Sequence, residues 1–94
     1  DIKRKYKLPD SISLNIELTK DNWYVAESTD VPGLFTQARS QEELLDMVND
    51  AVLTYFDVPH NEANKMIYIP ETKNVTSLPN VTLTQTKFDL FVAV

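Results

Sequence analysis

Apolar and polar residues alternate along the first part of the chain, and this period of two predicts strands rather than helices. Lys20, Asp21 and Asn22 favour a turn after the first alternating stretch, and the aromatic, β-branched stretch that follows is expected to complete a β-hairpin. A second turn then leads into a third, shorter strand. The three strands are predicted at residues 12–19, 23–28 and 34–38.

The second turn contains Asp30, Pro32 and Gly33, and we expect these residues to have a structural role. Proline fixes φ and has no N–H, so it interrupts a strand ladder. The only glycine of the chain follows it directly, and this combination is typical of turns.

A helical period replaces the alternation after this third strand. Ser40 and Glu43 form a capping box, in which the hydroxyl and the carboxylate are placed to accept hydrogen bonds from each other's backbone N–H groups. Apolar residues then recur at intervals of three and four, and Pro59 ends the pattern, which predicts a helix over residues 41–57.

The last third of the chain has a weaker pattern. A short strand closed by Pro70 is predicted at residues 65–69, and the polar residues 71–80 are predicted as a loop. Apolar residues then change phase near Thr86 and Lys87, so we expect a bulge or two short strands there.

This order of elements predicts an α+β fold, in which an antiparallel sheet of β-β-β-α-β(-β) order carries one main helix on one face. Residues 9–94 are expected to form a single domain, preceded by a basic N-terminal arm at residues 1–8. The chain has 94 residues, 43% of them hydrophobic, and no cysteine, so its stability must come from core burial without disulfides. No apolar stretch approaches the roughly 20 residues that a bilayer requires, and we expect a cytoplasmic protein without membrane association.

The net charge of −5 combines +3 in the first seven residues with −8 in the remainder. An acidic body repels phosphate, so nucleic-acid binding is disfavoured except through residues 1–8. The clearest acidic feature is a series of like charges at i,i+4 spacing on the predicted helix, at Glu42, Asp46 and Asp50. These residues are either a solvated face or a docking stripe for a basic partner protein.

The residues offer no enzyme signature, and we expect no catalytic residue, cofactor or metal. His60 is the only histidine and there is no cysteine, so a usual zinc site cannot form. Glu17, Glu27 and Asp30 are conceivable magnesium ligands on adjacent strands, but carboxylates are also ordinary on solvent-facing sheet surfaces.

The final segment is apolar on both faces of a strand, with Phe88, Leu90 and Val92 in one phase and Phe91 in the other. An unpaired edge strand of this kind invites pairing with another chain, which predicts self-association. The alternative is a central strand that is covered on both faces.

The stretch at residues 23–45, which begins W-Y-V-A-E-S-T-D-V-P-G-L-F-T-Q-A, resembles the HicB-like antitoxin superfamily and particularly its short relatives. The resemblance implies a partial ribonuclease-H-like fold without catalytic function, usually dimeric or higher. It also implies a partner, HicA, which is a small basic ribonuclease whose active histidine and RNA surface the antitoxin masks. Many relatives carry an additional DNA-binding segment, but no further helical pattern follows the predicted helix here.

The sequence therefore predicts a non-enzymatic protein-binding module, an antitoxin that occludes a small basic HicA-like toxin. The alternative is a nucleic-acid-binding or regulatory dimer that uses the basic N-terminal arm.

Overall fold

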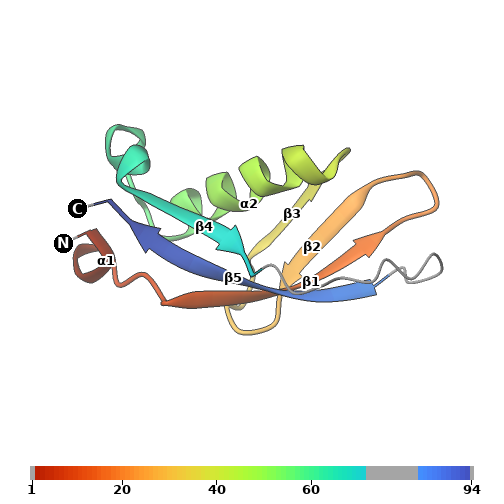
Figure 1. Ribbon diagram of the computed structural model, residues 1–94, viewed down its shortest axis with the longest axis horizontal. Helices are drawn as coiled ribbons and strands as arrows, with labels where there is room; N and C mark the ends of the chain where they lie inside the picture. Colours follow the sequence, from red (N-terminus) through yellow and green to blue (C-terminus); the bar gives the residue numbers. More distant parts are fainter. Residues whose placement is uncertain (1, 72–82, 94) are drawn as a thin grey trace.

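The computed structural model describes residues 2–71 and 83–93 of the chain. It confirms the predicted α+β class, with an antiparallel sheet and one main helix (Figure 1). The helices are α1 (Ile2–Lys5), α2 (Gln41–Tyr55) and the 3₁₀ helix η1 (His60–Lys65). The strands are β1 (Ser11–Leu18), β2 (Tyr24–Ser28), β3 (Phe35–Ala38), β4 (Met66–Pro70) and β5 (Leu83–Val92).

The five described strands form one curved sheet in the order β3-β2-β1-β5-β4, and every neighbouring pair is antiparallel. Figure 1 shows α2 lying across one face of this sheet. We call that face the inner face and the opposite one the outer face. The edges of the sheet are therefore β3 and β4, which lie far apart in the sequence from each other.

The hydrophobic core fills the space between α2 and the inner face. Leu44, Val48 and Val52 of α2 are buried at intervals of four, which is the amphipathic period that the sequence predicted. The sheet contributes alternate residues of its strands because successive side chains point to opposite faces. Its fully buried members include Ile12, Leu14, Ala26, Ala38 and Tyr68.

The N-terminal segment that we predicted as a basic arm packs onto this core. Ile2 and Leu8 are buried and belong to the same cluster as the sheet and helix residues. Tyr6 is half-buried and its hydroxyl donates to Glu62 of η1. Isolated apolar residues in a run of cations have no periodicity, so the sequence pattern did not reveal this packing.

The helix ends at Tyr55, earlier than predicted, because Asp57 adopts a left-handed conformation with φ of 56°. The Val58 N–H then donates to the Leu53 carbonyl at 2.8 Å, and the Asp57 N–H donates to the Thr54 carbonyl at 3.3 Å. This is the Schellman arrangement, which normally uses glycine at the left-handed position.

The predicted bulge near Thr86 and Lys87 is wrong. The pairing of β5 with β1 runs without interruption from Leu83 to Asp89, so both halves belong to one strand. The predicted loop at 71–80 lies outside the described residues except for Glu71.

Candidate partner-binding surface

An acidic stripe, defined here as Glu42, Asp46 and Asp50, lies on the solvent side of α2. All three side chains are exposed, and the helical period places them opposite the buried Val48. The ion pairs of the described residues involve other carboxylates, namely Asp10, Glu62 and Asp89. The stripe therefore keeps its negative charge available to a partner.

The acidic stripe is only partly favourable for the helix itself. Ser40 is the N-cap, and its hydroxyl accepts a hydrogen bond from the Glu43 N–H at 3.1 Å. Glu42 and Glu43 lie in the first turn, where the helix dipole favours negative charge. Asp46 and Asp50 are beyond that turn, and each i,i+4 like-charge pair costs roughly 0.2–0.5 kcal/mol in an isolated helix.

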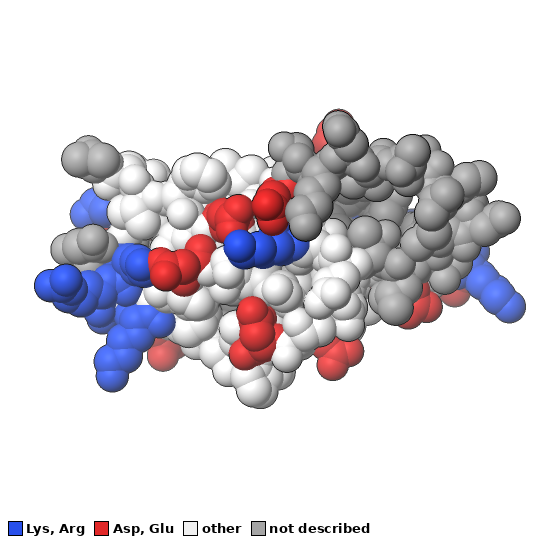
Figure 2. Space-filling view, turned by 60° about the horizontal axis from the view of Figure 1, so that its bottom comes forward, with Lys and Arg blue, Asp and Glu red and all other residues white. Residues whose placement is uncertain are grey.

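Several basic residues gather at the end of the molecule that carries α1, at the left of Figure 2, and other blue side chains lie in the middle of this face and at the opposite end. Several of them are already paired, since Lys3 contacts Asp10 and Lys5 lies 3.5 Å from Glu62. Glu62 also approaches Lys65 at 3.7 Å. The hydrogen bond from the Tyr6 hydroxyl lowers the pKa of Glu62 below its ordinary value and raises the pKa of Tyr6.

The turn that was predicted from the sequence is hydrogen-bonded to the end of the β1–β2 pair. The Asp30 carboxylate accepts from the Ser13 N–H at 3.2 Å and from the Ser28 hydroxyl at 2.8 Å. Gly33 has φ of +83°, and the Leu34 N–H donates to the Val31 carbonyl across the turn, as in a type II turn with proline before glycine. Asp30 is thus engaged in the turn.

The predicted self-association residues divide between the core and the surface. Phe88 is buried, and Leu90 and Val92 pack against the core on the inner face. Strand β5 pairs with β1 as far as Asp89 and with β4 from Phe88 to Val92, so it is a central strand of the described sheet. Phe91 alone of the predicted set is exposed, at 55%.

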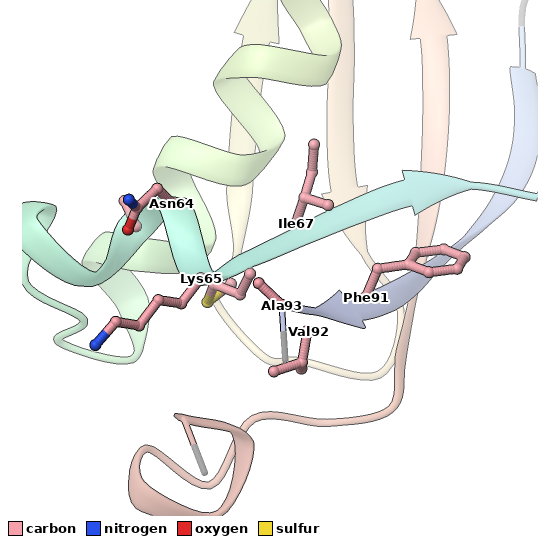
Figure 3. Close-up of a pocket in the computed structure, with 8 residues that line it drawn as sticks. Asn64, Lys65, Ile67, Phe91, Val92 and Ala93 are labelled. Atoms are coloured by element: carbon pink, nitrogen blue, oxygen red, sulfur yellow. The ribbon is translucent and has the colours of Figure 1, made fainter.

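Phe91 belongs to an apolar patch on the outer face that we did not predict. Ile67, its partner across β4 and β5, is 41% exposed and Ile69 is 39% exposed. A shallow groove of about 460 Å³ adjoins Ile67 and Phe91 and continues to η1 (Figure 3). The signal was present in the sequence, because Met66 to Ile69 is apolar in both phases of a strand.

The β4 edge of the sheet is occupied by a side chain from α2. The Asn49 Oδ1 accepts from the Tyr68 N–H at 2.7 Å, and its Nδ2 donates to the Tyr68 carbonyl at 3.0 Å. Pro70, at the end of the strand, has no N–H to offer. This edge is therefore protected against pairing with another chain.

The described residues contain no group of three His, Cys, Asp or Glu side chains that could hold a metal ion. Glu17 and Glu27 are exposed on the outer face, and their backbone partners are Val25 and Asn15 rather than each other. His60 is exposed at the start of η1. None of the described helices is long and apolar enough to span a membrane.

Residues 14–68 match a family described as a domain of unknown function, DUF1902. A UPF0150 protein of Archaeoglobus fulgidus is 39% identical to the chain over 46 residues, which is 49% of this chain and 67% of the relative. No solved structure matches the chain. The family match runs from Leu14 within β1 to Tyr68 within β4, and thus includes α2 with the acidic stripe.

Proposed function

The chain belongs to the DUF1902 family, and from this premise we propose that it is a non-catalytic module that binds a basic partner protein. The observation that carries the proposal is the acidic stripe, whose three exposed carboxylates make no ion pair among the described residues. Complementary charge on a partner raises the association rate and discriminates against other proteins.

The proposed partner is a small basic HicA-like ribonuclease, and the chain is its antitoxin. Support comes from the resemblance of residues 23–45 to HicB-like antitoxins, because these residues include the Asp30 to Gly33 turn and the start of α2. The mechanism is occlusion: α2 covers the cationic surface with which the ribonuclease binds RNA. Both proteins act in the cytoplasm in this proposal.

Co-expression with the product of the adjacent open reading frame tests the proposal. We expect a small basic protein to co-purify with the chain and the chain to relieve the growth arrest that this protein causes. The triple variant Glu42→Gln, Asp46→Asn, Asp50→Asn should lose both effects.

The matched control is Glu17→Gln, Asp21→Asn, Glu71→Gln, which changes the charge equally at exposed positions outside α2 and β3. This control should behave as wild type. Absence of a basic co-purifying protein would refute the antitoxin proposal, and equal losses in both variants would refute the role of the acidic stripe.

We also propose that the chain self-associates through the outer-face patch of Ile67, Ile69 and Phe91. Exposed apolar side chains from two adjacent strands favour burial against another surface. Phe91→Lys should shift the sedimentation coefficient from dimer or higher to monomer, whereas Phe35→Lys, at a residue 53% exposed at the opposite end of the sheet, should not. A wild-type monomer at all concentrations would refute this proposal.

The nucleic-acid alternative places function at the basic end, where Arg4 and Lys7 are exposed. It predicts binding to RNA or DNA that weakens steeply with salt and is lost in Arg4→Gln, Lys7→Gln. The pairing of Lys3 and Lys5 with Asp10 and Glu62 disfavours this alternative.

A further inference from the structure

The two edges of the sheet differ in what their backbone offers. On β4, the Asn49 side chain is hydrogen-bonded to the Tyr68 N–H and carbonyl, and Pro70 has no N–H. On β3 no equivalent side chain is present among the described residues. The free edge of the sheet is therefore β3.

The alternation of hydrogen bonds identifies the free groups of β3. The Ser28 N–H donates to the Leu34 carbonyl at 2.9 Å, so Leu34 faces β2. In an antiparallel ladder, every second residue bonds to the same neighbour, so the N–H and carbonyl groups of Phe35 and Gln37 point to the open side. No described residue is hydrogen-bonded to these groups. The Phe35 side chain is 53% exposed.

Negative charge lies close to this edge. Helix α2 begins at Gln41, three residues after β3 ends at Ala38, so Glu42 and Glu43 of its first turn lie near that end of the strand. Glu27, the cross-strand neighbour of Phe35 on β2, is exposed on the outer face. The one cation between β3 and α2, Arg39, lies over the Trp23 ring at 4.3 Å.

We propose that the free edge of β3 accepts an extended, lysine- or arginine-rich segment of the basic partner as an added strand. The segment bonds to the backbone of Phe35 and Gln37, and its cations lie beside the carboxylates of α2. This inference rests on the proposed function, since the same partner contacts the acidic stripe. It adds the mode of binding, in which main-chain hydrogen bonds supplement charge.

A second copy of this chain is less suited to pair with the β3 edge than the basic segment of the partner. Antiparallel pairing of two β3 strands about a two-fold axis places both α2 helices on the same face of the joined sheet. Each helix carries the acidic stripe, so the two copies repel one another across the junction.

The experiment uses two charge-matched peptides as probes, with ¹⁵N-labelled protein observed by NMR. Acetyl-(Lys-Val)₄-amide is able to add as a strand, whereas acetyl-(Lys-Pro)₄-amide lacks half of the required N–H groups. We expect (Lys-Val)₄ to bind more tightly, and to slow the solvent exchange of the Phe35 and Gln37 amides selectively. This readout needs no variant.

Gln37→Pro removes an outward N–H that β2 does not use, so the fold should be retained, which thermal unfolding checks. Gln37→Thr is the control that keeps the N–H. We expect Gln37→Pro to weaken (Lys-Val)₄ binding about fivefold or more relative to Gln37→Thr, since one net hydrogen bond is lost. Binding of (Lys-Pro)₄ should be unchanged.

The outcomes separate this inference from the proposed function. Equal binding of both peptides, without slower exchange of the Phe35 and Gln37 amides, would overturn the strand addition. The charge-based docking of the proposed function would still stand if the acidic-stripe triple variant bound both peptides more weakly. Concentration-dependent protection of the two amides without peptide would show that a second copy takes the edge, and would also overturn the inference. Absence of binding by either peptide would contradict both proposals.

Discussion

Asn49→Ala is predicted to destabilise the protein by removing the bridge between α2 and β4. The Asn49 amide makes two hydrogen bonds to the Tyr68 backbone and a third to the Leu45 carbonyl at 2.9 Å. Alanine makes none of these bonds. The Tyr68 N–H and carbonyl point away from β5, so no strand of the described residues replaces the lost partner.

The magnitude follows from these bonds. A net contribution of about 1 kcal/mol for each hydrogen bond gives a loss of roughly 3 kcal/mol, because three are removed. Alanine has the higher helix propensity, which offsets about 0.5 kcal/mol. The expected loss in the free energy of unfolding is therefore about 2–3 kcal/mol. In a domain of this size that corresponds to a fall in Tm of roughly 10–20 °C.

Urea unfolding followed by circular dichroism measures this loss, with Asp50→Ala as the control on the next residue of α2. Asp50 is exposed and its removal relieves a like-charge pair, so the control should be as stable as wild type or slightly more stable. Asn49→Ala should also aggregate more readily, since the β4 edge is opened. A loss below about 1 kcal/mol, or equal to the control, would refute the bridging role assigned to Asn49.

Two further predictions concern the turn and the packing of the N-terminal segment. Gly33→Ala should lower the free energy of unfolding by about 1–2 kcal/mol because φ is +83°, although nothing lies within 4 Å of the added Cβ. Asparagine tolerates this conformation better, so Gly33→Asn should lose less stability. Equal losses in the two variants would contradict the conformational explanation. Glu62→Gln should reduce stability at neutral pH. Because the Tyr6 hydrogen bond lowers the Glu62 pKa below 4.5, the wild-type advantage should be complete above that pH and disappear as the pH falls through the lowered value; a difference that persists at pH 2 would contradict this linkage.

The elements with a clear hydrophobic period were predictable from the sequence. The alternation through β1 and the three- and four-residue spacing of α2 reflect burial on one face, and Val48 and Ile12 are indeed buried. The structure places Ser40 at the N-cap of α2 because capping depends on residues only three positions apart. Local patterns of this kind need no knowledge of distant contacts.

Features that depend on contacts between distant residues were not predictable. Asn49 is a polar residue inside a helical pattern, and its role becomes evident only once β4 lies beside α2. The strand order makes β5 central, so the apolar residues Leu90 and Val92 pack in the core rather than at an edge. The acidic stripe was visible from spacing alone, but the free edge of β3 depends on the strand order.

The association rate of the chain with its purified basic partner, measured between 50 and 300 mM salt, tests the central claim most directly. The acidic-stripe triple variant should associate about tenfold more slowly at low salt and show little salt dependence, as expected when steering charges are removed. The matched control variant outside α2 and β3 should retain the wild-type rate and salt dependence. Identical rates and salt slopes for the two variants would contradict the claim that the partner docks on the acidic stripe of α2.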